Sequence, residues 1–125
     1  MKELTKAEEQ VMQILWKKEK AFVKEIIEEM GDPKPAYNTV STIVRILETK
    51  GFVDHEEFGK SHRYYPLTSK KEYSKFRMND MVKNYFGNSA KQVVSFFANN
   101  RKINMQEADE IIKMLEEIKK DRKND

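Results

Sequence analysis

The chain has 125 residues, enough for one domain or for two small ones. With 38% hydrophobic and 36% charged residues, each helix can have one buried and one solvated face, and no apolar run approaches the ~20 residues that would span a bilayer. The absence of cysteine excludes disulfides and thiolate metal sites, and the charged residues after Met1 are unlike a signal peptide, so we expect a cytoplasmic protein with no membrane insertion.

The net charge of +3 and the pI near 9.0 favour a nucleic-acid partner only weakly. The segment Met1–Glu72 contains 13 Lys/Arg and 13 Asp/Glu and is therefore neutral, while the surplus, 11 Lys/Arg against 8 Asp/Glu, lies after it. Any positive surface on the first part of the chain must come from the arrangement of its charges in space.

The first helix is expected at about Lys6–Lys18. Thr5 is a good N-cap residue and Glu8 stands three positions later, which is the pattern of a capping box. Apolar residues then recur at the spacing of a helix with one buried face: Leu4, Val11, Met12 and Leu15. Trp16 lies beside this stripe, and an aromatic residue at such a position predicts core packing.

A second helix follows a break at Glu19–Phe22. Val23–Met30 is amphipathic and about two turns long. Gly31 is expected to end it in the left-handed conformation, and the prolines of Asp32–Pro35 prevent its continuation.

The third helix is expected to start near Ala36 or Tyr37 and to stop at Gly51. Its buried stripe consists of Val40, Ile43, Val44 and Leu47. Small hydrogen-bonding side chains occupy the remaining faces near its N-terminus. Two short helices joined by a tight turn, the second carrying such side chains, form a helix-turn-helix.

Two β-rich runs come next. Phe52–Phe58 and His62–Leu67 flank the Gly-containing turn Gly59–Ser61, which predicts a hairpin. Pro66 indicates that the second strand is an edge strand or ends there. A hairpin directly after a helix-turn-helix is the wing of a winged helix, so a DNA-binding domain is expected over residues 1–68.

The remaining residues, 69–125, predict three more helices. Ser69 opens the first, Ser89 the second and Asn104 the third. The last helix is expected to bury Ala108, Ile111, Ile112, Leu115 and Ile118. These helices carry more apolar surface than so small a unit can bury alone, which favours a homodimer. The residues expected at the dimer interface are Tyr85, Phe86, Val93, Val94, Phe96, Phe97, Ile111, Ile112, Leu115 and Ile118.

The fold class predicted from this order is mainly α with a small β wing: a winged helix-turn-helix domain followed by a three-helix dimerisation region. The predicted partner is double-stranded DNA with an inverted-repeat operator, because a two-fold dimer matches a palindromic site. The third helix reads bases and the wing contacts phosphates. The residues expected to do so are Ala36, Tyr37, Asn38, Thr39, Ser41, Thr42, Arg45, Lys60, Ser61, His62 and Arg63.

Other functions are less well supported by the residues. His55 and His62 lie on neighbouring strands with Glu57 as the nearest third ligand, but zinc sites favour clustered His and Cys ligands, so no metal site and no cofactor is expected. No nucleophile–base pair or phosphate-binding loop is evident, so an enzyme is not expected. A winged-helix protein-interaction module without DNA binding and a small-molecule-sensing regulator remain as alternatives.

Several segments resemble the penicillinase-repressor (BlaI/MecI/CopY) family. They are Leu4–Glu8 with Val11–Trp16, Thr39–Thr42, Arg45–Leu47, Lys50–Phe52 and Tyr64–Leu67. The resemblance is strong from Leu4 to Leu67 and beyond Ser69 rests mainly on helix order and length. It implies a dimeric winged-helix repressor with a helical dimerisation region.

The resemblance also implies how repression ends. In the β-lactam branch the repressor sits on palindromic operators of a resistance operon, and a membrane sensor metallopeptidase triggers cleavage in the dimerisation region. The cut falls at an Asn-Phe bond that aligns with Phe96–Phe97, so the Asn is replaced and the Phe is retained. The copper-responsive branch ends in a cysteine-rich metal motif, which this chain lacks.

Overall fold

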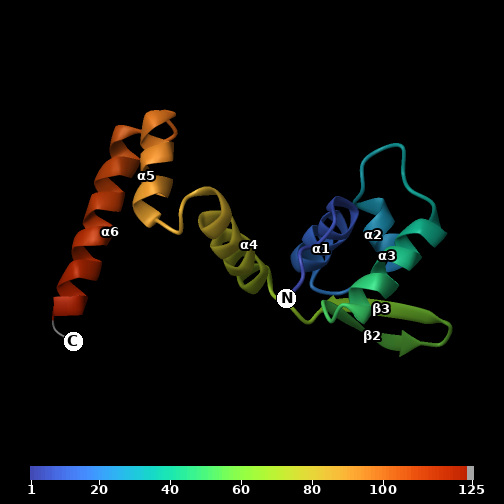
Figure 1. Cartoon of the computed structure of the whole chain (residues 1–125). Helices are drawn as coiled ribbons and strands as arrows, with labels where there is room; N and C mark the ends of the chain where they lie inside the picture. The colour runs from blue at the N-terminus through green and yellow to red at the C-terminus, as the bar shows by residue number, and fades with distance from the viewer. Residues whose placement is uncertain (124–125) are drawn as a thin grey trace. The chain divides into compact units, whose positions relative to one another are not determined.

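The computed structural model describes residues 1–123, which form two compact units, Met1–Met78 and a second one from Asn79 onward (Figure 1). The first unit holds α1 (Lys6–Lys18), β1 (Ala21–Phe22), α2 (Val23–Glu28), α3 (Tyr37–Thr49), β2 (Val53–Phe58) and β3 (Ser61–Pro66). The later helices are α4 (Lys70–Tyr85), which crosses the boundary, α5 (Ala90–Asn99) and α6 (Met105–Lys123). In the part of the chain described, none of the helices combines the length and apolar character needed to cross a bilayer.

The expected start of α1 is confirmed in detail. The Thr5 hydroxyl accepts from the Glu8 backbone N–H, and the Glu8 carboxylate accepts from the Thr5 backbone N–H at 2.9 Å, which completes the capping box. The predicted apolar stripe of α1 is buried in the core of the first unit. Trp16 packs against that core, and its indole N–H donates to the Thr68 carbonyl at 2.8 Å.

The sheet has three strands instead of the predicted two. β1 pairs antiparallel with β3, with Ala21 opposite Tyr64, so that β3 lies in the middle of the order β1-β3-β2. A strand of two residues is too short to show an alternating pattern, which is why the sequence did not indicate it. Pro66 is the last residue of β3 and therefore ends the strand without interrupting the sheet.

The prediction that Gly31 ends the second helix in a left-handed conformation is wrong. α2 stops at Glu28, Glu29 caps it in the right-handed region, and Gly31 has no positive φ. The free carbonyls at this end are satisfied by Lys34, whose Nζ donates to the Met30 oxygen at 2.7 Å and to the Glu28 oxygen at 3.2 Å. Because a lysine supplies the cap, no glycine geometry is needed.

The first part of α4 belongs to the core of the first unit. Tyr73 is buried, its ring packs edge-on against Phe52 at a centroid distance of 5.8 Å, and its hydroxyl accepts from the Leu4 backbone N–H at 2.9 Å. Phe76 packs against the same cluster. These contacts explain why the first unit extends to Met78.

The second unit leaves most of its apolar side chains exposed. Among the described residues, α5 and α6 contain no buried side chain. The expectation that the last helix buries Ile112, Leu115 and Ile118 is wrong for the single chain, where they are 54%, 49% and 43% exposed. Ala108 and Ile111 are partly buried. The apolar faces of α5 and α6 are therefore largely exposed in the single chain.

Candidate nucleic-acid interface

The candidate interface with DNA includes the face of α3 opposite the core. Val40, Val44 and Leu47 are fully buried and hold the helix on the first unit. The opposite face is exposed and carries Asn38, Thr42 and Arg45, which are spaced by four and three residues. The periodicity that buries one stripe therefore exposes the other.

Hydrogen bonds within α3 determine which groups this face offers. The Thr42 hydroxyl donates to the Asn38 carbonyl at 2.9 Å, so its hydrogen is used and its oxygen offers lone pairs. The Arg45 Nε donates to the Ser41 carbonyl at 3.3 Å, which holds the guanidinium along the helix. The exposed stripe thus combines an amide, an acceptor hydroxyl with its methyl group, and a cation.

The N-terminus of α3 lies next to the wing. Ala36 is the N-cap and provides no side-chain cap, so the first N–H groups of the helix are not covered by a capping side chain. Tyr37 is 53% exposed and lines one shallow pocket together with Ser61 and His62 of β3. This groove lies between the start of α3, the wing and α2, which lines it with Lys24, Glu25 and Glu28.

Two predicted residues of α3 lie beside the exposed stripe. Thr39 is exposed but lines a pocket with Pro33 and Pro35, on the side of the helix that faces the preceding turn. Ser41 is partly buried, and its carbonyl is the acceptor for Arg45. Both positions flank the surface that Asn38 and Arg45 occupy.

The wing turns tightly at its tip. Gly59 has a φ of 61°, a left-handed conformation that glycine adopts without strain, and Lys60 follows it. Lys60 and Ser61 are exposed at this turn. His62, one residue further, is partly buried and stacks on His55 with ring centroids 4.1 Å apart.

Arg63 is placed differently from the other predicted wing residues. Alternation along β3 puts it on the opposite face from His62. Its Nη2 donates to the Glu56 carboxylate at 3.2 Å, and its guanidinium lies over the Phe58 ring at 4.7 Å. Arg63 is thus engaged within the sheet, and the structure does not bring it together with Lys60 and Ser61.

A buried ion pair fixes the end of α3 to the start of α1. The Lys50 ammonium donates to both Glu8 carboxylate oxygens, at 2.8 and 3.0 Å, and the Glu8 side chain is 6% exposed. Burial raises the pKa of the Glu8 carboxyl, but the bonds from Lys50 and Thr5 outweigh it and hold the pKa below its ordinary value of 4.5. This pair joins the C-terminal end of α3 to the first turn of α1, in addition to the apolar contacts of α3 with the core.

Two neighbours of the recognition surface were not found from the sequence. Lys2 lines a shallow pocket with Thr42 and Arg45, although it precedes the first helix and belongs to no periodic pattern. Glu48, on the side of α3 that faces the wing, hydrogen-bonds the Nδ1 of His55. This bond raises the pKa of His55, because its effect exceeds the lowering of the pKa by burial.

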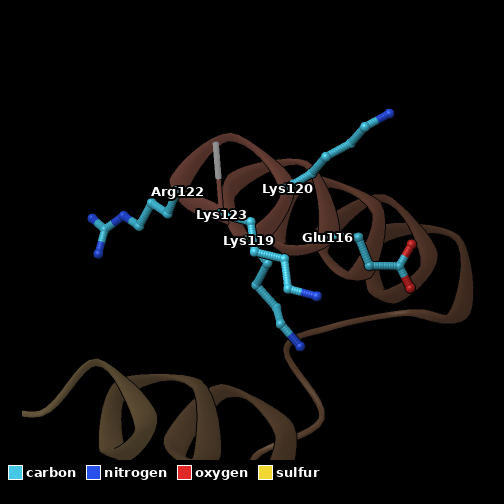
Figure 2. A pocket seen from close by; sticks show the side chains of 5 residues that line it. All are labelled: Glu116, Lys119, Lys120, Arg122 and Lys123. Carbon is cyan, nitrogen blue, oxygen red and sulfur yellow. The ribbon is translucent and has the colours of Figure 1, made fainter. Parts of the chain in front are cut away.

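A second concave surface lies at the end of α6. It is lined by Glu116, Lys119, Lys120, Arg122 and Lys123, all on one helix (Figure 2). Figure 2 shows their side chains pointing in different directions and not toward a common point. Basic residues in a last helical turn are favoured by the helix dipole, and this role accounts for the charges without a ligand.

The order of helices, the exposed polar stripe on α3 and the adjoining wing define a winged-helix DNA-binding protein. The family model of the penicillinase repressor matches residues 4–117. The chain belongs to the penicillinase repressor family and is therefore a transcriptional repressor. The mainly α fold with an N-terminal winged helix, expected from the sequence, is confirmed by the structure and by the solved BlaI domain described below.

Relatives with assigned functions are similar along nearly their whole length. The penicillinase repressor of Bacillus licheniformis is 24% identical over 122 residues, which is 97% of this chain and 95% of the relative. The methicillin resistance regulatory protein MecI of Staphylococcus aureus (strain N315) is 26% identical over 114 residues, 90% of this chain and 93% of the relative. The solution structure of the DNA-binding domain of the repressor BlaI is 27% identical, with a TM-score of 0.50 over 58% of this chain and 94% of that domain.

Proposed function

We propose that this protein is a homodimeric transcriptional repressor that binds a palindromic operator with α3 in the major groove and the wing on the adjacent backbone. The observation that supports it best is the exposed stripe of Asn38, Thr42 and Arg45, which lies directly opposite the buried face of α3. Residues 1–68 bind DNA in this proposal, and residues 69–125 form the dimer.

The stripe has the chemistry of base recognition. The Asn38 amide can donate to and accept from adenine, and the Thr42 oxygen accepts from an exocyclic amine while its methyl group meets a thymine methyl. Arg45, further along the helix, reaches guanine or a phosphate. Thr39, Ala36 and Ser41 flank these contacts.

Contacts to the DNA backbone come from the groove that α3 shares with the wing. Lys60 and Ser61 lie at the exposed hairpin tip, and Tyr37 and His62 border the groove between tip and helix. The first N–H groups of α3 add a positive helix pole that no N-cap side chain hydrogen-bonds. Arg63 contributes by stabilising the sheet through Glu56.

Selection of bound DNA from a random pool tests the proposal. We expect enrichment of an inverted repeat with half-sites at least one helical turn apart, roughly 34 Å. Asn38→Ala should change the sequence preference, with each lost base contact worth about 1–3 kcal/mol of discrimination, whereas Lys60→Gln should weaken all sequences alike. Enrichment of no repeat at low salt would refute DNA recognition and favour a protein-interaction module.

The dimer is supported by the exposed apolar side chains of the second unit. They come from the end of α4 (Tyr85), from α5 (Val94, Phe96, Phe97) and from α6 (Ile112, Leu115, Ile118), with Phe86, Val93 and Ile111 partly buried among them. An apolar surface of this extent on one unit favours association. Sedimentation should give a dimer mass for the wild type and a monomer for Leu115→Glu, while Glu117→Gln, on the same helix, remains a dimer.

Release of the operator is proposed to follow cleavage of the chain at Phe96–Phe97 by a membrane sensor metallopeptidase that acts on this cytoplasmic repressor, as the family resemblance implies. Both phenylalanines lie inside α5 and are 47% and 41% exposed, so the bond is near the surface but must unwind before a protease can bind it. A cut there separates α6 from the rest of the chain. Insertion of a specific protease site between these residues should let cleavage abolish dimerisation and operator binding together.

A further inference from the structure

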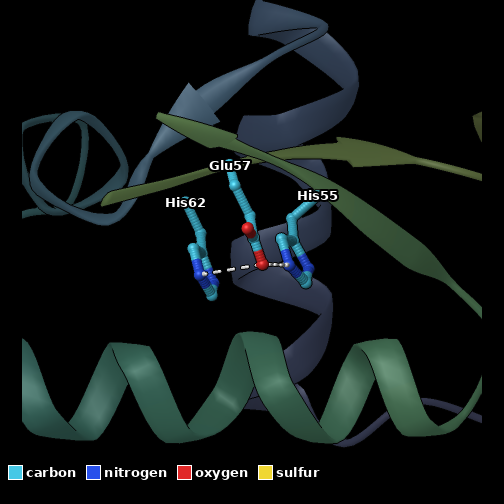
Figure 3. Close-up of side chains that lie close together, drawn as sticks. All are labelled: His55, Glu57 and His62. Atoms are coloured by element: carbon cyan, nitrogen blue, oxygen red, sulfur yellow. Dashed lines mark ion pairs between the residues drawn. The ribbon is translucent and has the colours of Figure 1, made fainter. Parts of the chain in front are cut away.

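Three potential metal ligands lie on one face of the wing. His55 and Glu57 are two positions apart on β2, and His62 on β3 is paired with Glu57, so all three side chains project from the same side of the hairpin. The Glu57 Oε1 lies 3.9 Å from the His55 Nε2 and 4.0 Å from the His62 Nε2 (Figure 3). Figure 3 shows one oxygen of the Glu57 carboxylate joined by dashed lines to both imidazole rings, on the side of the sheet that faces α3.

A fourth residue orients one of these ligands from outside the hairpin. The Nδ1 of His55 is bonded to the Glu48 carboxylate of α3. When the Nδ1–H of the neutral imidazole donates to Glu48, the Nε2 lone pair is left free to bind a metal ion. Histidines that bind metals are held in this way, with the second ring nitrogen donating to a carboxylate.

We propose that the wing binds one divalent transition-metal cation of the zinc type through the His55 Nε2, the Glu57 carboxylate and the His62 Nε2, with Glu48 as the positioning residue. Two imidazoles with one carboxylate suit this class of ion, whereas calcium and magnesium prefer sets composed of oxygen ligands. Three protein ligands leave a fourth position open to water, as in other His and carboxylate zinc sites.

Binding an ion requires shorter distances to Glu57 and a rotation of one imidazole ring. Metal–nitrogen bonds of about 2.0–2.1 Å in a tetrahedral site separate neighbouring ligand atoms by roughly 3.4 Å, so each distance to Glu57 must shorten by about 0.6 Å. The two imidazole planes are 9° from parallel, and one ring must turn so that both lone pairs meet. His62 and Glu57, whose side chains are 40% and 72% exposed, have room to move while Glu48 holds His55.

Binding is measured on the full chain at pH 8 by calorimetry with Zn²⁺ and by visible absorption with Co²⁺, which is intense only in tetrahedral sites. We expect one ion per chain. His62→Gln and Glu57→Gln should each weaken binding at least tenfold, and Glu48→Gln should weaken it by roughly 10–100-fold without removing a direct ligand. Glu117→Gln, which changes an exposed carboxylate on α6, is the matched control and should bind like the wild type.

Fluorescence of Trp16, the single tryptophan, checks that each variant is folded before titration. The site is overturned if the wild type binds no Zn²⁺, or if His62→Gln and Glu57→Gln both bind with unchanged affinity. If Glu48→Gln alone binds like the wild type, the ligand set holds and the positioning role of Glu48 is wrong.

Discussion

Replacing Lys50 by methionine should destabilise the first unit strongly. The substitution removes the ammonium group that donates at 2.8 and 3.0 Å to a carboxylate whose side chain is 6% exposed. Glu8 then keeps its bond from the Thr5 N–H but has no countercharge from Lys50, and an uncompensated buried charge is costly.

The magnitude follows from the burial of the two partners. Breaking a fully buried ion pair costs about 3–5 kcal/mol, and the Lys50 side chain is 24% exposed, so water screens part of the loss. We therefore expect a loss of about 2 kcal/mol in the free energy of unfolding. For a unit of this size that loss lowers the Tm by roughly 8–16 °C.

Urea unfolding followed by the fluorescence of Trp16 measures the effect on the first unit. Lys20→Met is the matched control, because Lys20 makes an ion pair of the same 2.8 Å length with Glu56 at the surface, with side chains 50% and 38% exposed, and its loss should be close to the error of the measurement. A cycle with Glu8→Gln isolates the coupling between Glu8 and Lys50. Equal effects of Lys50→Met and Lys20→Met would refute the reasoning that burial gives the pair its strength.

Three further predictions concern other contacts. Folding lowers the pKa of Glu8, so its contribution to stability is complete above pH 4.5 and is lost as the pH falls through the lower pKa of the folded state. The free energy of unfolding, measured as a function of pH in the acid range, should therefore fall more steeply for the wild type than for Glu8→Gln. Equal slopes for the two proteins would contradict this. Tyr73→Phe leaves the Leu4 N–H buried without its acceptor and should cost about 1–3 kcal/mol by urea unfolding, while Tyr37→Phe, at an exposed position of the same unit, should cost nothing measurable. In DNA-binding titrations at several salt concentrations, Lys60→Gln should reduce the slope of log K against log salt by about 1, whereas Arg63→Gln should leave the slope unchanged. A reduced slope for Arg63→Gln and an unchanged slope for Lys60→Gln would show that Arg63 leaves Glu56 to bind phosphate.

Local patterns in the sequence were enough for most of the first unit. The capping box of Thr5 and Glu8 and the apolar stripe of α3 depend on residues three or four positions apart, which is the range over which helix geometry acts. The polar stripe of α3 was therefore predictable together with its buried stripe. The turn at Gly59 was predictable for the same reason, since a short glycine turn between two β-rich runs specifies a hairpin.

Pairing between distant segments was not predictable in this way. β1 forms only because Ala21 and Phe22 pair with β3, and the cap of α2 depends on Lys34, which lies beyond the helix end on the far side of Gly31. Arg63 was expected on DNA because its charge is visible in the sequence. The contacts of Arg63 with Glu56 and Phe58 depend on which face of β3 it occupies and on the register with β2.

The sequence by itself determined the winged-helix order and the polar face of α3, because both rest on spacing within single elements. Only the tertiary structure decided that Lys50 reaches Glu8, that Arg63 pairs with Glu56, and that Glu48 bonds His55 beside Glu57 and His62. Each of these depends on two elements packed at a particular depth and register, and the energies that select that packing are sums over many contacts between residues far apart in the chain.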